Sequence, residues 1–157
     1  MPPAEESEPH PMPKLGVRAL TQLIDLHFPQ VHEGSGPLII EQVDSRTARV
    51  RMTQDIRMVR PGGTISGPTM FKLADFTIYV AILAELGEGA LQAVTTSLNI
   101  NFLTRPIPGD MLAEARLIKI GRRLVVAEVE LYAAAHDEMV AHATGTYALP
   151  TIRVAVK

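Results

Sequence analysis

Apolar residues recur at helical spacing near the start of the chain and at alternate positions further on. Between Lys14 and Phe28 they fall three and four residues apart, which is the period of an amphipathic helix. From Ala48 to Thr53 apolar and charged residues alternate, as in a strand with one face in water. The apolar run from Leu38 to Val43 precedes it, with turn residues between the two runs. This pattern predicts a helix at residues 14–28 followed by a hairpin.

The most apolar stretch lies in the middle of the chain and predicts a single long helix at residues 67–87. Ser66 is suited to cap its N-terminus, and Pro68 fits the first turn because the N–H it lacks would be unpaired there. Apolar residues occur on almost every side of the helix until Gly87 ends it. A helix of this kind must be covered all round.

Four long segments that are typical of strands follow the central helix, with turn residues between them. They are Val94 to Leu103, Met111 to Ile120, Leu124 to Ala134 and Met139 to Leu149. A hairpin, one helix and then a meander predict an α+β fold, in which about six antiparallel strands curl around the helix. We expect a second copy of the chain to cover the free edge of this sheet.

Length and composition indicate how many domains the chain forms and in which cellular compartment it is expected. The chain has 157 residues, about the size of one domain. Residues 1–13 hold five prolines and three glutamates, which predicts a disordered tail and one domain at residues 14–157. No apolar leader or run of roughly 20 apolar residues is present. With no cysteine in the chain, we expect a cytoplasmic protein.

Composition also limits the chemistry. Fifteen Lys and Arg against seventeen Asp and Glu leave a charge of −2, which does not favour binding to nucleic acid. The absence of cysteine excludes thiol nucleophiles and thiolate zinc sites. The five histidines lack a spacing that would place two beside a carboxylate as metal ligands. We therefore expect a site built from carboxylates, hydroxyls and backbone amides, with no metal.

Asp75 is the candidate general base. On the predicted helix its near neighbours are apolar, including Phe71, Ile78 and Tyr79. A carboxylate on an apolar stripe has a raised pKa unless it is paired, and such groups are common at functional sites. The structural alternative is that Asp75 pairs with Lys72 or contacts a neighbouring strand.

The start of the same helix offers a second group. Gly67 has a free amide in the first turn, where the helix dipole favours a developing negative charge. A carboxylate two turns further along suits acyl transfer, especially if two subunits bring one helix start opposite the other's carboxylate. The alternative is that residues 66–68 are only a helix cap.

Two further groups of polar residues are candidates for ligand binding. Regular alternation of the strand that begins at Val94 places four small polar residues on one face: Thr95, Ser97, Asn99 and Asn101. That face could line a pocket or lie in solvent. Basic residues gather at two turns and could hold phosphate groups or serve solubility alone: Arg105, Lys119, Arg122 and Arg123.

Three segments carry a family resemblance. They run from Gly62 to Asp75 (GGTISGPTMFKLAD), from Thr95 to Pro106 (TTSLNINFLTRP) and from Pro108 to Asp110 (PGD). In this order they resemble the hotdog-fold acyl-CoA thioesterases of the phenylacetate-pathway (PaaI) type, over about Leu38 to Leu149. The resemblance implies a hotdog fold and hydrolysis of an acyl-CoA thioester to the free acid and CoA.

The resemblance also assigns roles to individual residues. It implies that Asp75 is the base or nucleophile, that the Gly67 amide polarises the thioester carbonyl, and that Thr95 orients the attacking water. The family has a histidine where this chain has Ser66, and a polar residue of the family falls on Arg60. The expected substrate-binding residues are Ser66, Arg60, Phe71, Ile78, Tyr79, Arg122 and Arg123, with the apolar ones lining the acyl tunnel and the last two arginines holding CoA phosphates.

The resemblance further implies a homodimer, or a dimer of dimers forming a homotetramer, in which Gly67 of one subunit faces Asp75 of the other. No cofactor is expected, because CoA is part of the substrate. The loss of the family histidine at Ser66 leaves a non-catalytic acyl-CoA binding protein as the alternative. A dehydratase or hydratase of the same fold typically requires an Asp/His pair near the helix start. No histidine lies between His32 and His136, so the sequence argues against this activity.

Overall fold

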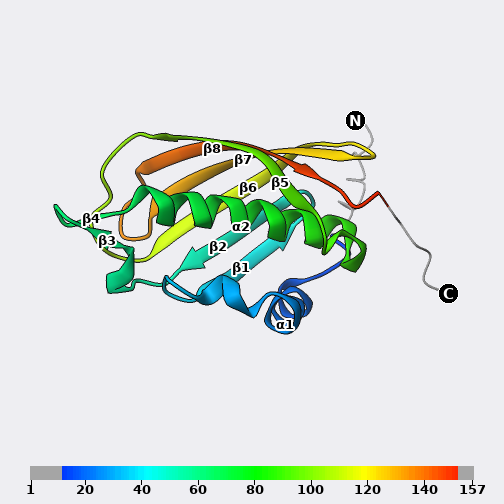
Figure 1. Ribbon diagram of the computed structural model, residues 1–157, viewed down its shortest axis with the longest axis horizontal. Helices are drawn as coiled ribbons and strands as arrows, with labels where there is room; N and C mark the ends of the chain where they lie inside the picture. Colours follow the sequence, from blue (N-terminus) through cyan, green and yellow to red (C-terminus); the bar gives the residue numbers. More distant parts are fainter. Residues whose placement is uncertain (1–11, 152–157) are drawn as a thin grey trace, which may run out of the picture.

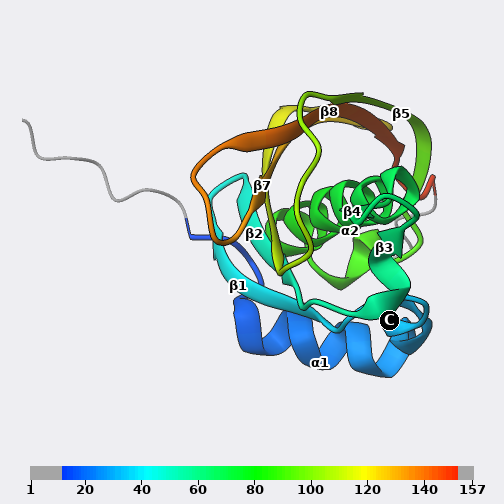
Figure 2. The same ribbon diagram turned by 90° about the vertical axis from the view of Figure 1, so that its left-hand side faces the viewer.

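The computed structural model describes residues 12–151 of the chain. A six-stranded antiparallel sheet curls around one long helix, α2 (Gly67–Leu86), which lies in its concave side (Figures 1 and 2). The shorter helix α1 (Val17–His27) packs beside the β1 edge of the sheet (Figure 2). This arrangement confirms the predicted α+β fold. The tail expected at residues 1–13 lies, except for its last two residues, outside the described residues.

The strands of the main sheet follow the predicted segments closely. Their order across the sheet is β1 (Leu38–Asp44), β2 (Thr47–Met52), β6 (Met111–Ile120), β7 (Leu124–Ala133), β8 (Met139–Ala148) and β5 (Val94–Phe102). A small hairpin, β3 (Val59–Arg60) and β4 (Thr64–Ile65), forms around the Pro-Gly-Gly turn. Three short 3₁₀ segments complete the fold: η1 (Pro29–His32), η2 (Ile56–Met58) and η3 (Glu88–Ala90).

The central helix begins and ends as its residues predict. Ser66 caps it, since its Oγ accepts a hydrogen bond from the Thr69 amide at 3.3 Å. Gly87 ends it with a φ of 82°, a conformation that favours glycine. Most of the helix is buried, as an all-round apolar surface requires. No helix in residues 12–151 is both long and apolar enough to cross a membrane.

The two faces of the sheet differ in polarity. The concave face carries small and aliphatic residues that pack on α2, such as Val50, Ala113 and Val129, all fully buried. The convex face carries charged residues in cross-strand pairs, such as Arg116 on β6 with Glu128 on β7. Alternation along each strand produces this division.

Strand β5 departs from regular alternation at its start. Thr95 pairs with Tyr147 of β8, but Ser97 pairs with Thr146, so the register shifts by a bulge at Thr96. Residues paired directly across two strands lie on the same face of the sheet. Thr95 therefore faces α2 together with Tyr147, while Ser97 faces outward. The prediction that Thr95 shares a polar face with Ser97 is wrong, because a bulge moves the residues before it to the other face.

Substitution of Gly36 by alanine tests the tight packing of the segment that precedes β1. A Cβ added at Gly36 would lie 1.7 Å from the carbonyl oxygen of Thr53, and backbone cannot give way as a side chain can. We expect Gly36→Ala to lower the free energy of unfolding by about 3 kcal/mol, measured by chemical denaturation. Gly89→Ala is the control, since nothing lies within 4 Å of a Cβ there. Equal stability of the two variants would contradict this packing.

Candidate active site

A cavity of about 1050 Å³ opens between α2, the segment after α1 and the start of β5. Much of its wall is apolar, with Phe28 and Val31 from the N-terminal segment and Phe76 and Tyr79 from α2. Asp75 lies on the same wall and is partly exposed. The cavity therefore combines a largely apolar lining with a few polar groups, among them the accessible carboxylate of Asp75, which is the usual composition of a small-molecule site.

The Asp75 carboxylate is held at one of its two oxygens. Thr95 Oγ1 donates a hydrogen bond to Oδ1 at 2.6 Å, and the hydroxyl of Tyr147 donates to the same oxygen at 2.5 Å. The Tyr147 hydroxyl also lies 2.8 Å from the backbone carbonyl oxygen of Asp75. Within residues 12–151, Oδ2 accepts no hydrogen bond. One oxygen is thus fixed, and the other is open to a ligand or to water.

Tyr147 is the functional candidate that sequence reasoning missed. Its ring is almost fully buried and stacks on Tyr79, with centroids 6.4 Å apart and planes 20° from parallel. Tyr79 is fixed in turn, because its hydroxyl donates to the Leu91 carbonyl oxygen at 2.6 Å. The one available signal was a tyrosine on the concave side of its strand, since a buried tyrosine hydroxyl needs a partner.

Burial raises the pKa of the Tyr147 phenol well above its ordinary range, and the negative charge of Asp75 raises it further. The phenol therefore stays protonated and remains a hydrogen-bond donor. Burial also raises the pKa of Tyr79.

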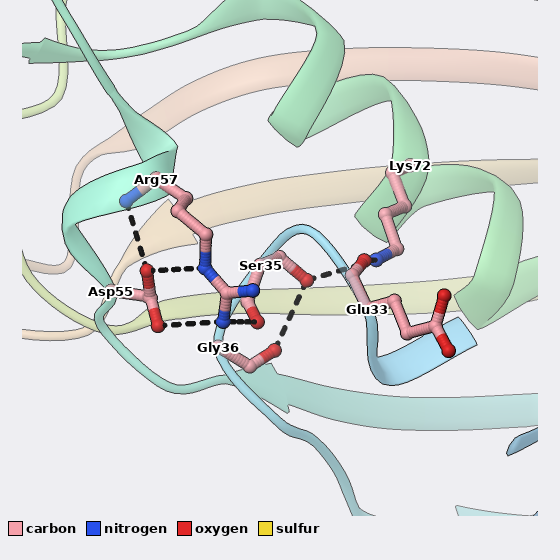
Figure 3. Close-up of polar contacts among 6 residues, drawn as sticks. All are labelled: Glu33, Ser35, Gly36, Asp55, Arg57 and Lys72. Carbon is pink, nitrogen blue, oxygen red and sulfur yellow. Dashed lines mark hydrogen bonds and ion pairs between the residues drawn. The ribbon is translucent and has the colours of Figure 1, made fainter. Parts of the chain in front are cut away.

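Lys72 does not pair with Asp75, although the two residues are three apart on α2. Its Nζ donates to the Glu33 carbonyl oxygen at 2.8 Å and to Ser35 Oγ at 2.9 Å (Figure 3). Both acceptors are neutral. Burial lowers the pKa of Lys72, and the nearby charge of Arg57 lowers it further. Lys72 therefore ties α2 to the segment after η1, which forms part of the cavity wall.

That segment is also held from its other side. Arg57 Nη2 donates to the Ser35 carbonyl oxygen at 3.1 Å, and the Arg57 guanidinium forms two 2.9 Å hydrogen bonds with the Asp55 carboxylate (Figure 3). These hydrogen bonds lower the pKa of Asp55 to about 2. The Ser35 hydroxyl in turn donates to the Gly36 carbonyl oxygen at 3.1 Å. Residues 33–36 are thus fixed beside the cavity by two cations on different elements.

Gly67 lies in a different place from Asp75. It begins α2, so its amide has no intrahelical acceptor, and it lines a second cavity of about 420 Å³ with Phe71 and Phe102. Eight residues of helix separate Gly67 from Asp75, which is about 12 Å along the axis. One chain therefore does not bring the predicted oxyanion amide to the predicted base.

Helical geometry sorts the predicted acyl-tunnel residues. At 3.6 residues per turn, Tyr79 projects about 40° to one side of Asp75, and Ile78 projects about 60° to the other. Tyr79 accordingly lines the large cavity. Ile78 lies fully buried in the core, beside Gly145 of β8, so the tunnel expectation does not match its position. Phe71, on the Ile78 side, lines the second cavity instead.

The predicted polar contacts to substrate lie at three places. Ser66 is the helix cap already described, and Arg60 is exposed on β3. Arg122 and Arg123 are exposed in the turn between β6 and β7. The sheet register aligns Leu124, the first residue after this turn, with Ala148 and then with Val94 at the start of β5. The two arginines therefore lie at the end of the sheet where the large cavity is found.

Known proteins match this chain in sequence and in structure. Residues 62–140 match the family model described as the Thioesterase superfamily. A solved structure of a candidate thioesterase from Silicibacter sp. TM1040 is 37% identical with a TM-score of 0.79, covering 88% of this chain and 94% of that one. A curated candidate esterase from Saccharolobus solfataricus is 29% identical over 109 residues, 68% of this chain and 69% of the relative.

The PaaI protein of the Escherichia coli phenylacetic acid degradation operon shares the fold. It is 24% identical with a TM-score of 0.64, over 72% of this chain and 79% of that chain. The match to the family model spans half of the chain and includes Gly67, Asp75 and Thr95. The names of the more similar relatives indicate a hydrolase. The chain belongs to the Thioesterase superfamily.

Proposed function

We propose that this protein is an acyl-CoA thioesterase of the PaaI type that uses Asp75 as its general base. The observation that carries the proposal is the Asp75 carboxylate at the large cavity, with Oδ1 held by two hydroxyls and Oδ2 open. A base must be near the proton it removes and must keep a fixed orientation. The apolar side chains around it suit the acyl part of the substrate.

In the proposed reaction, Oδ2 of Asp75 takes one proton from a water molecule. The water oxygen forms a bond to the thioester carbonyl carbon, and the bond from that carbon to sulfur then breaks. The proton passes from Asp75 to the CoA thiolate, so the products are a free acid and CoA. Thr95 has donated its hydroxyl proton to Oδ1, so it contributes only as an acceptor for the second proton of the water.

The developing oxyanion requires a donor, and the predicted one, the Gly67 amide, lies about 12 Å along the helix axis from Asp75 of the same chain. We propose that the Gly67 amide of a second subunit supplies it, at the positive end of helix α2. Strand β5 supports this assembly, because it forms an edge of the sheet and exposes the apolar residues Val94 and Phe102. Pairing of β5 with β5 of a second copy would give hydrogen-bond partners to the backbone groups at this edge. Two dimers then form the proposed tetramer.

The CoA part of the substrate carries phosphates, which arginine binds well. We propose that Arg122 and Arg123 hold them, since the turn that carries both residues lies at the cavity end of the sheet. Tyr79 and Phe76 would then contact the acyl group inside the cavity.

Replacement of Asp75 by asparagine tests the proposed base. We expect Asp75→Asn to reduce kcat about 10²- to 10⁴-fold on a panel of short, medium and aromatic acyl-CoAs, because the amide cannot accept the proton. Release of CoA is followed with a thiol reagent. Asp137→Asn, at an exposed turn, is the matched control and should retain full activity. Wild-type turnover by Asp75→Asn would exclude this mechanism, and saturable acyl-CoA binding without CoA release by the wild type would favour the binding protein.

Added charges on β5 test the proposed assembly. Light scattering of the wild type is expected to give two or four times the 17.1 kDa chain mass. Asn99→Lys with Asn101→Lys places like charges across a β5–β5 contact and should reduce that mass twofold or more, with loss of activity. Ile39→Lys with Gln42→Lys, on the opposite edge strand β1, is the control. A monomeric wild type that hydrolyses acyl-CoA would rule out the shared site.

A further inference from the structure

The hydroxyl of Tyr147 contacts Asp75 at two points, which no other side chain does in residues 12–151. It reaches the carboxylate at Oδ1 and the backbone carbonyl oxygen of the same residue, at 2.5 Å and 2.8 Å. A hydroxyl placed between a side chain and its own backbone restricts rotation of that side chain. Thr95 contacts only the carboxylate.

We propose that Tyr147 is a positioning residue that holds Oδ1 of Asp75 and so makes Oδ2 the oxygen that receives the proton. This inference rests on the proposed function and deepens it, because it states which oxygen acts and what orients it. Tyr147 touches neither the water nor the thioester in this scheme. It acts only through the orientation of Asp75.

The surroundings of Tyr147 suit a rigid positioning role. Its ring is buried on the concave side of β8, with 3% of its surface exposed, and it stacks on Tyr79. Tyr79 also makes a T-shaped contact with Phe28, with ring centroids 6.1 Å apart and planes at 87°. Tyr147 therefore has little freedom to move its hydroxyl, whereas Thr95 is on an exposed part of an edge strand.

The bulge in β5 explains why two hydroxyls reach the same oxygen of Asp75. The register shift in β5 places Thr95 opposite Tyr147, so their hydroxyls converge on a single carboxylate oxygen. Hydrogen bonds to a charged group are worth about twice those between neutral groups. Two donors on one oxygen therefore hold the carboxylate in a single orientation.

Replacement of Tyr147 by phenylalanine keeps the buried ring and removes only the hydroxyl. We expect Tyr147→Phe to reduce kcat about 10- to 100-fold with KM changed less than about twofold, since a misplaced base costs rate more than binding. Tyr132→Phe, whose hydroxyl contacts Glu130 on the convex face, should change neither quantity.

An unchanged kcat in Tyr147→Phe would overturn the positioning role while the thioesterase activity stands. A lower kcat accompanied by a comparable rise in KM and a lower Tm would also overturn it, because a general loss of packing, and not a misplaced base, would then explain the result. If the wild type hydrolyses no thioester, the proposed function fails separately. The contact is then tested through Tm values of Tyr147→Phe, Asp75→Asn and the double variant: strictly additive losses contradict it, and a departure of about 3 °C from additivity supports it.

Discussion

The rest of the structure depends on the burial of one helix that is apolar on nearly all sides. Because α2 has apolar residues on nearly every side, the sheet must curl around it. The N-terminal helix α1 covers part of what the sheet leaves open (Figure 2). Asp75 interrupts this apolar surface, so the fold has to supply hydrogen-bond donors at that point. The candidate site therefore forms at the point where a carboxylate interrupts the apolar surface of α2.

Much of the fold was predictable, because it follows from periodicity. The long apolar run of α2, its cap at Ser66 and its end at Gly87 identify the helix, and alternation identifies the strands. Asp75 was predictable for a related reason, since a lone carboxylate stands out on an apolar stripe. These features are local in the sequence, so no knowledge of tertiary contacts was needed to find them.

The partners of Asp75 were less predictable, because they depend on register. The bulge at Thr96 turns Thr95 inward, and no residue type in that strand announces it. Tyr147 lies 72 residues from Asp75 in sequence, and only the order of the strands brings the two together. Ile78 was misplaced for another reason. Helical geometry turns it about 100° away from its neighbour Tyr79, and only the packing of the sheet on α2 decides that this side faces the core.

The position of Lys72 shows why the obvious local pairing does not form. An ammonium beside Asp75 would stabilise the ionised carboxylate and make it a weaker base. Instead the Glu33 carbonyl oxygen and the Ser35 hydroxyl hold Lys72, and Arg57 with Asp55 fixes the segment that carries these acceptors (Figure 3). Neutral hydroxyls remain as the donors to Asp75, and they orient it without cancelling its charge. The network around residues 33–36 therefore keeps a cation occupied elsewhere on the cavity wall, away from the proposed base.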